Sequence, residues 1–160
     1  MRTAQSTHRE LWKESDHEPP VMLVNFIYTT CPTVCSALGS EFTQMQAVIS
    51  KQRPSSRSPI ELVSISFDTE HDDAAQLAAY ARVHHADSDV WTIAAPTSQE
   101  DSARLLRELG VVVVRDGIGG YVHNGSIHVM TATGRVKAIY DAADWQAALA
   151  MATRLATAAP

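Results

Sequence analysis

One short segment, residues 21–28, constrains the fold more than any other part of the chain. It reads VMLVNFIY, nearly continuous in apolar residues and interrupted only by Asn25. A run of this kind is typical of a strand that is covered on both faces, as the strands of parallel sheets are. Apolar residues then recur at intervals of three or four and predict an amphipathic helix: Val34, Leu38, Phe42, Met45 and Ile49. We therefore expect a buried strand that leads directly into a helix.

A second strand and a second helix follow the same order. Residues 60–67 alternate in hydrophobicity and predict a strand. Thr69, with Asp72 three residues later, matches the pattern in which a hydroxyl residue and an acid cap the start of a helix. The alanine-rich helix that this pattern begins is expected to run to about His85. Two strand–helix units of this kind imply parallel pairing of their strands.

The second half of the chain predicts one more such unit and then an antiparallel pair. Residues 90–93 indicate a short strand, and Thr97 or Ser98 begins a helix that ends at Gly110. Beyond it we expect, in order, a β-prone segment (111–114), a glycine-rich loop with little intrinsic rigidity (115–126), a hairpin (127–130 with 136–140) and a C-terminal helix carrying Trp145, Leu149 and Leu155.

The order of these elements predicts an α/β fold. Early strands joined by helices and a late hairpin are satisfied by a mixed central sheet flanked by helices, and a cysteine pair after the first long strand makes this arrangement thioredoxin-like. We expect residues 1–20 to be a polar lead-in, with one helical turn around Leu11 and Trp12, and residues 21–160 to form a single thioredoxin-like domain.

Composition excludes some classes of function. A chain of 160 residues with 45% hydrophobic and 19% charged residues is typical of one globular domain. A net charge of −5, without a run of Lys or Arg, argues against a nucleic-acid partner. The first half contains no apolar stretch as long as a membrane span, and residues 1–20 lack the apolar core of a signal peptide. We therefore expect any targeting segment or membrane anchor to lie outside this sequence.

The only two cysteines, Cys31 and Cys35, stand at the predicted strand-to-helix turn. Thiolates are the soft ligands that copper(I) and zinc prefer, and they are also the nucleophiles of disulfide exchange. A helix beginning near Thr33 would present its unpaired amides and its positive end to both sulfurs, which favours the thiolate. Two thiolates leave a metal ion incompletely coordinated, so a metal site here requires a third ligand from elsewhere in the fold.

The segment NFIYTTCPTVC, residues 25–35, resembles the signature of the Sco/SenC family of copper-binding, thioredoxin-like proteins. Members of that family have a CxxxC pair and a histidine far downstream, shortly before a strand that ends in a Gly-Arg or similar turn. His123 stands 88 positions after Cys35 (123 − 35) and eleven before the Gly-Arg pair at 134–135, which fits this layout. The segment ISFDTE, residues 65–70, resembles the strand-plus-acid segment of the family.

This resemblance implies that Cys31, Cys35 and His123 bind one copper ion, as Cu(I) or Cu(II), and that the two cysteines form a redox pair. It implies a copper metallochaperone in the assembly of cytochrome oxidase, whose copper-site subunit, or another copper or thiol protein, would be the partner. Family members are tethered to a membrane and face the bacterial periplasm or the mitochondrial intermembrane space. We therefore expect a periplasmic location, with an anchor that this sequence does not contain.

The chain departs from the family beside the histidine, because many members carry an acid where this chain has Val122. His128, five residues after His123, would point to the opposite face of an extended strand, and we expect it on the strand surface. Asp68, at the end of a predicted strand, orients the neighbouring turn, assists a partner contact or caps a helix, and the sequence leaves all three open.

Two other functions stay open on the sequence alone. In a thiol–disulfide oxidoreductase, Cys31 and Cys35 would be catalytic without an obligatory metal, and His123 would be incidental or would tune the pKa of a thiol. A redox or copper sensor would use the same residues to signal to a partner, although no docking patch is recognisable in the sequence. Turnover of a disulfide substrate without metal distinguishes the enzyme from the chaperone.

Overall fold

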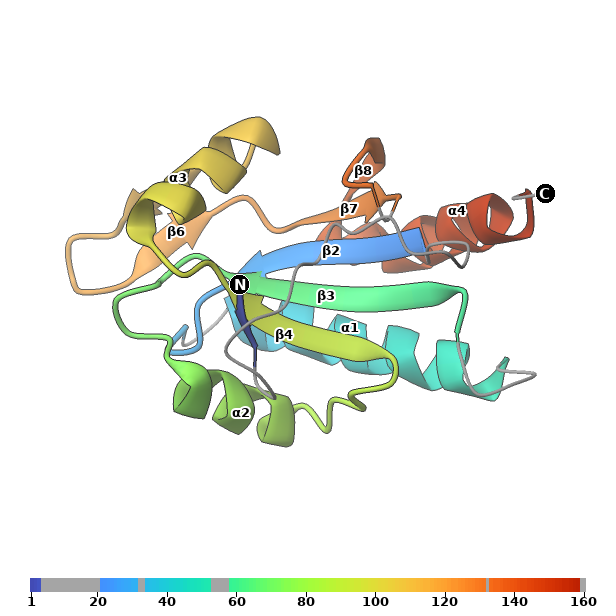
Figure 1. The fold of residues 1–160 in the computed structure, drawn as a ribbon, viewed down its shortest axis with the longest axis horizontal. Coiled ribbons are helices and arrows are strands. Elements are labelled where there is room, and N and C mark those ends of the chain that lie inside the picture. The colour runs from blue at the N-terminus through green and yellow to red at the C-terminus, as the bar shows by residue number, and fades with distance from the viewer. Residues whose placement is uncertain (4–20, 32–33, 53–57, 132, 159–160) are drawn as a thin grey trace.

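The computed structural model describes residues 1–3, 21–31, 34–52, 58–131 and 133–158. Its centre is a six-stranded sheet in the order β1-β4-β3-β2-β7-β8, and β5 and β6 form a separate two-stranded sheet (Figure 1). The strands are β1 (Arg2–Thr3), β2 (Val21–Ile27), β3 (Ile60–Ser66), β4 (Trp91–Ala95), β5 (Val113–Arg115), β6 (Tyr121–His123), β7 (Ser126–Met130) and β8 (Val136–Asp141). The predicted α/β class with a mixed sheet is confirmed, since β2, β3 and β4 are parallel while β1, β7 and β8 are antiparallel to their neighbours.

Strand β2 is the buried strand that the sequence predicts. All seven of its residues are buried, and it pairs with β3 on one edge and β7 on the other. Its last residue, Ile27, lies opposite Ser66, the last residue of β3. Because the two strands are parallel, both carboxyl ends reach the same edge of the sheet. That edge carries the turn with Cys31 and the acidic segment that follows β3.

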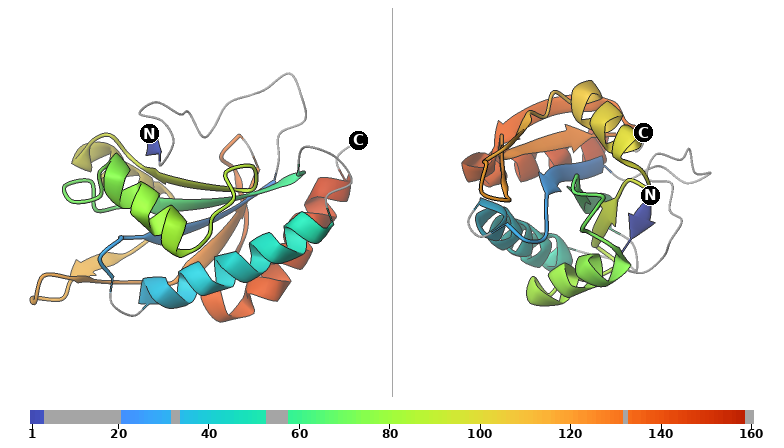
Figure 2. Two further views of the ribbon diagram at one scale, coloured as in Figure 1. Left: turned by 90° about the horizontal axis from the view of Figure 1, so that it is seen from below. Right: turned by 90° about the vertical axis from the view of Figure 1, so that its left-hand side faces the viewer.

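Helices cover both faces of this sheet. They are α1 (Val34–Lys51), α2 (Ala74–Val83), α3 (Gln99–Glu108), α4 (Trp145–Ala158) and a short 3-10 helix, η1 (Ala142–Asp144). Helices α1 and α4 lie side by side on one face (Figure 2). The end of α2 lies against α1 on that face, because the ring of His84 occupies the space that a Cβ on Gly39 would need. Helix α3 lies on the opposite face, so the thioredoxin-like layering is present.

The helix ends show which side chains start and stop each helix. Ser98 caps α3 by accepting a hydrogen bond from Asp101 N, and Gly110 follows the helix with φ of +67°, both as predicted. The capping pattern predicted at Thr69 is wrong. Asp73 caps α2 instead, because its Oδ1 accepts hydrogen bonds from the amides of residues 75 and 76.

The glycine-rich segment 115–126 is not the loop that we expected. Its first and last parts belong to a hairpin in which β5 pairs with β6, and Ser126 begins β7. The connection between β5 and β6 contains Gly117 and Gly119, which have φ of +80° and +99°. The Asp116 carboxylate accepts hydrogen bonds from the amides of Ile118 and Gly120 and so closes the turn. His123 therefore lies on a paired strand.

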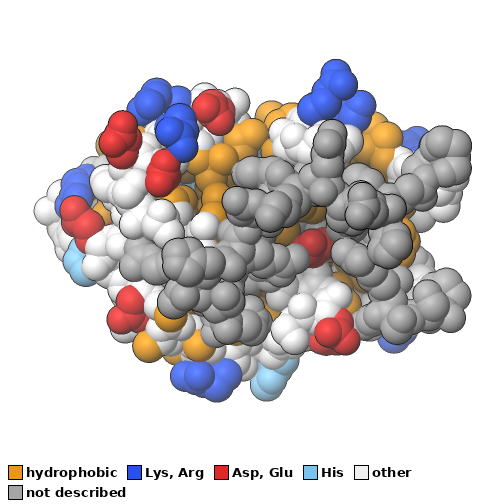
Figure 3. Space-filling model, viewed as in Figure 1, with side chains coloured by type: hydrophobic (Ala, Val, Ile, Leu, Met, Phe, Trp, Pro, Cys, Tyr) orange, Lys and Arg blue, Asp and Glu red, His pale blue; other side chains and the backbone are white. Residues whose placement is uncertain are grey.

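The N-terminal residues add an edge strand, because Arg2 and Thr3 pair antiparallel with β4. The helical turn expected around Leu11 and Trp12 lies outside the described residues, and the domain boundary after residue 20 stays a prediction. On the face seen in Figure 3, the acidic and basic side chains of the described residues are interspersed. The predicted absence of a nucleic-acid partner likewise stays a prediction.

Candidate metal centre

The turn after β2 carries the first cysteine. Its backbone closes through the amide of Cys31, which donates to Tyr28 O at 3.3 Å, and Cys31 is half-buried at the end of the turn. Cys35 falls in the first turn of α1, but its side chain lies outside the described residues, as do residues 32 and 33. The distance between the two sulfurs and their joint role therefore stay predictions.

Asp72 holds this turn in place. Its carboxylate is fully buried (0% exposed) and accepts hydrogen bonds from the amide of Thr29 at 2.9 Å and from the hydroxyl of Thr29. The hydroxyl of Ser66, at the end of β3, donates to the same carboxylate. A charged acceptor shared by two strand ends fixes the start of the Cys31 turn relative to β3. The sequence does not distinguish Asp72 from its neighbour Asp73, which caps the helix.

Asp68 lies in the acidic segment that follows β3. It is buried, and His71 Nδ1 donates to its carboxylate oxygens at 2.9 and 3.0 Å. That hydrogen bond, together with the charge of Asp68, raises the pKa of His71. Burial raises the pKa of Tyr121, and the nearby Asp68 charge adds to the effect. Asp68 is therefore not a helix cap; it lies between His71 and the β6 strand.

His123 is positioned by aromatic packing. Its ring centroid lies 5.3 Å from that of Phe67 and 6.4 Å from that of Tyr28, both edge to face. The hydroxyl of Tyr28 donates to Tyr121 O and accepts from Tyr121 N, each at 3.2 Å. Strand β6 is thus attached to the ends of β2 and β3. Tyr28 therefore contacts both predicted ligands: its backbone carbonyl accepts from the Cys31 amide, and its ring packs against the ring of His123.

The imidazole of His123 is in a state that suits a metal ligand. Burial lowers its pKa, so the ring is neutral near pH 7. Nδ1 faces the carbonyl oxygen of Asn124 at 3.3 Å, and a carbonyl requires that this nitrogen carry the hydrogen. The ring lone pair then belongs to Nε2. A backbone carbonyl that fixes the tautomer in this way is the usual support for a histidine ligand.

The donor set fits a soft metal in its chemistry, since it combines a thiol with a neutral imidazole at one edge of the sheet. Among the residues whose side chains are described, no three His, Cys, Asp or Glu lie close enough together to hold a metal ion. Since the Cys35 side chain is not among them, the set of Cys31, Cys35 and His123 stays a prediction.

His128 was predicted on the strand surface, and this is wrong. It is 1% exposed, lies edge to face with Phe26, and its Nε2 lies 3.0 Å from Leu109 O. Leu109, the residue after α3, covers this face of β7. The alternation of residues along β7 does not reveal that this distant residue buries His128. Burial lowers the pKa of His128, so the ring is neutral. It is a core residue on the far side of β7 from α1.

A family model described as SCO1/SenC matches residues 3–158. The SCO1 protein homolog of Bacillus subtilis (strain 168) is 25% identical over 123 residues, which are 76% of this chain and 62% of that protein. The chain therefore spans less than two thirds of the length of this curated relative.

Solved structures share the fold. A SCO1/SenC family lipoprotein from Bacillus anthracis str. Ames superposes with a TM-score of 0.81 and 20% identity, over 96% of this chain and 90% of that one. ScoI of Bradyrhizobium japonicum with copper bound gives a TM-score of 0.68 and 21% identity, over 86% and 85%. ScoI of Arabidopsis thaliana with copper bound gives 0.68 and 16%, over 86% of both chains. Within the described part of the chain, no helix is long and apolar enough to cross a membrane.

Proposed function

Because this chain belongs to the SCO1/SenC family, we propose that it is a copper metallochaperone that binds one copper ion through Cys31, Cys35 and His123. The observation that carries the proposal is the packing of His123 on Tyr28, whose carbonyl closes the turn that bears Cys31. Two proteins of the same fold have structures with copper bound.

The chemistry of the three residues supports this assignment. Thiolates at the start of α1 are stabilised by the positive end of the helix and supply soft donors. The neutral imidazole of His123 adds a nitrogen donor, which suits both Cu(I) and Cu(II). Copper is the cargo of such a site, so its affinity has to be moderate enough for a recipient to compete.

The two thiols give this proposal a redox component. Reduced Cys31 and Cys35 hold copper as thiolates. Transfer of two electrons from these thiolates to a partner disulfide joins their sulfurs as a disulfide, which removes two ligands and releases the ion, and the partner's two thiolates take up two protons from water. A disulfide switch has been identified in one structural relative, BsSco, a member of the Sco family of cytochrome c oxidase assembly proteins. By the same analogy, the recipient is the copper-site subunit of cytochrome oxidase.

The location belongs to the same proposal. A relative with this fold is a lipoprotein, and a tethered protein on the periplasmic side would meet copper and the oxidase subunit there. Fusion of the full-length protein to a reporter that is active only outside the cytoplasm tests this part, and a signal confined to the cytoplasm would contradict it.

Metal analysis tests the ligand set. After loading of reduced protein with Cu(I) in the presence of a competing chelator, we expect about one copper per chain for the parent and loss of copper in Cys31→Ala, Cys35→Ala and His123→Ala. His85→Asn is the matched control, because His85 is an exposed histidine whose φ of 52° asparagine tolerates. Near-stoichiometric copper in His123→Ala would remove this histidine from the site.

The oxidoreductase alternative makes a different prediction for the same protein. Turnover of a disulfide substrate by the metal-free chain, unchanged in His123→Ala, would favour an enzyme that does not need copper. A metallochaperone shows at most slow metal-free turnover and loses copper retention in that variant.

A further inference from the structure

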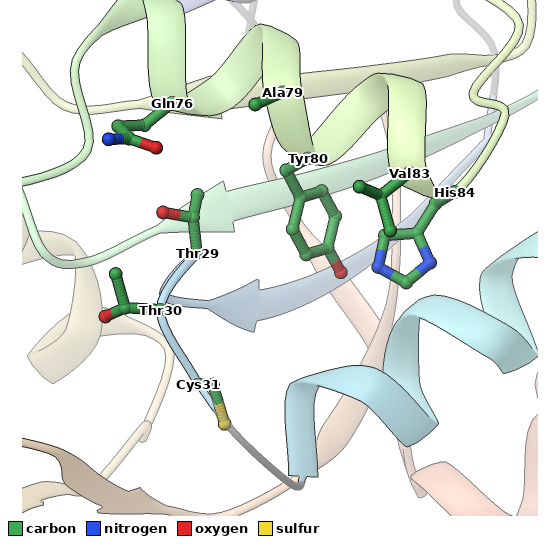
Figure 4. A pocket seen from close by; sticks show the side chains of 8 residues that line it. All are labelled: Thr29, Thr30, Cys31, Gln76, Ala79, Tyr80, Val83 and His84. Atoms are coloured by element: carbon green, nitrogen blue, oxygen red, sulfur yellow. The ribbon is translucent and has the colours of Figure 1, made fainter.

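A hollow of about 290 Å³ lies beside Cys31. One wall is the turn after β2 and the other is helix α2. The residues that line it are Thr29, Thr30, Cys31, Gln76, Ala79, Tyr80, Val83 and His84. Figure 4 shows Tyr80 and His84 projecting from α2 into the space that Cys31 borders. Whatever fills this hollow therefore lies against the sulfur-bearing residue.

Hydrogen bonds and ring contacts hold both walls of the hollow. The turn is fixed by the hydrogen bonds of Thr29 to buried Asp72. The ring of Tyr80 on α2 and that of His84, just after α2, are tilted at 45° with centroids 4.3 Å apart, and His84 packs closely over Gly39 of α1. A hollow with fixed walls is a preformed site, because little ordering is needed when a ligand enters.

The lining is uncharged. None of the described residues that line the hollow is Lys, Arg, Asp or Glu, and burial lowers the pKa of His84, so its ring is neutral. A small charged thiol such as glutathione finds no countercharge here. Val83 stands at the rim with 72% of its surface exposed, next to Ala79, and both favour an apolar side chain. The hydroxyl of Thr30 and the amide of Gln76 are exposed and offer hydrogen bonds to a peptide backbone.

We propose that this hollow, which we call the α2 hollow, receives an apolar side chain next to the cysteine of a partner protein that exchanges with Cys31. The proposal rests on the proposed function, because it identifies the polypeptide that reaches the thiol or its copper. It makes the residue beside the partner's cysteine a determinant of specificity.

Mixed-disulfide formation measures this recognition without copper. The probes are two capped, uncharged peptides whose cysteine is linked to 2-thiopyridine, one with leucine and one with glycine beside the cysteine. The Cys31 thiolate attacks the peptide sulfur, a Cys31–peptide disulfide forms, the peptide–thiopyridine bond breaks, and pyridine-2-thione leaves with the proton that Cys31 lost. A Cys35→Ser background in the full chain keeps the mixed disulfide from being resolved, and the released thione gives the rate.

We expect the leucine peptide to react about tenfold faster than the glycine peptide, because an apolar pocket favours a side chain that fills it over one that leaves it empty. Val83→Ser removes apolar surface at the rim and Ala79→Gln fills the hollow, and each should reduce the ratio of the two rates to about twofold or less. Using the ratio cancels any change in the reactivity of the thiol itself. Ile139→Ser is the matched control, since Ile139 is an apolar residue 56% exposed on β8, outside the hollow, and it should keep the parent's ratio.

Three outcomes would overturn the proposal: equal rates for both peptides in the parent, a preference that survives in both α2 variants, or faster reaction with the 2-thiopyridine derivative of glutathione than with the leucine peptide. The last would identify a small charged thiol as the occupant. Copper retention is measured separately on the parent and on the same α2 and β8 variants with Cys35 restored. Equal peptide rates in the parent, with intact copper binding by the chain that has both cysteines, reject only the α2 hollow. A leucine preference in the parent, without copper binding by that chain, rejects only the metallochaperone.

Discussion

Two neighbouring aspartates, Asp72 and Asp73, have separable roles. Asp72→Ala leaves three donors from Thr29 and Ser66 without their acceptor inside the protein. We expect the free energy of unfolding to fall by about 3 kcal/mol, and copper affinity to fall with it, because the turn that carries Cys31 loses its anchor. Chemical denaturation and chelator competition measure the two effects.

Asp73→Ala is the control for this change. It removes the helix cap of α2 and should lower the free energy of unfolding by about 1 kcal/mol, with copper affinity unchanged. If both variants lost copper affinity in proportion to their stability, the specific role of Asp72 in holding the turn would be refuted.

Buried histidines make stability depend on pH. Burial lowers the pKa of His128 below its ordinary value of 6.5, so the folded state resists protonation more than the unfolded chain does. Above about pH 6.5 both states are neutral and stability is intact. As the pH falls below that value, the unfolded state takes up the proton first, and the free energy of unfolding decreases.

His128→Leu removes this one titration. Urea unfolding at about pH 7.5 and about pH 5.5 should show a smaller loss of stability on acidification in the variant than in the parent. His84 and His123 shift in the same direction and keep part of the effect, while His71, whose pKa is raised, opposes it. An equal loss in both proteins would mean that His128 is not the neutral core residue described above.

The hydroxyl of Tyr28, the residue after β2, makes two hydrogen bonds that attach β6 to the end of β2. Tyr28→Phe keeps the ring against His123 but deletes both hydrogen bonds to the backbone of Tyr121. We expect a global destabilisation of only about 1 kcal/mol, faster hydrogen exchange at the Tyr121 amide, and copper affinity about tenfold lower, as for other outer-shell supports. Tyr140→Phe on β8 is the control, and an equal loss of affinity there would exclude a special role for Tyr28.

Elements whose hydrophobic residues lie on one face, or that are hydrophobic throughout, could be predicted from the sequence. Features that depend on contacts with distant parts of the chain could not. Strand β2 and helix α1 follow from local hydrophobicity, since Leu38, Phe42, Met45 and Ile49 are all buried. The β5–β6 hairpin was missed because its glycines dominate the composition, although valines and Tyr121 flank them. His128 was misplaced because the chain after α3 covers it, and that cover comes from another part of the fold.

The candidate site was predictable only in its chemistry. A CxxxC pair is visible in the sequence, and resemblance to a family was needed to select His123 among seven histidines. The hydrogen bonds of Tyr28 and Asp72 were not predicted, because they form where the ends of β2, β3 and β6 meet. Such contacts join residues 93 positions apart in the case of Tyr28 and Tyr121.

Copper bound by the proposed ligands would join the start of α1 to β6, and this gives a prediction for the whole molecule. A ligand that binds only the folded state, at a hundredfold excess over its dissociation constant, adds about 2.7 kcal/mol to the free energy of unfolding. For a domain of this size that raises Tm by about 5–10 °C. Calorimetry of the reduced chain with and without Cu(I) should show this shift, its reversal by chelator, and its loss in Cys31→Ala and His123→Ala. The His85→Asn control should retain it. If copper raised the Tm of His123→Ala as much as that of the parent, the ion would not be linking the cysteine turn to β6, and the metal would have to be held at the turn alone.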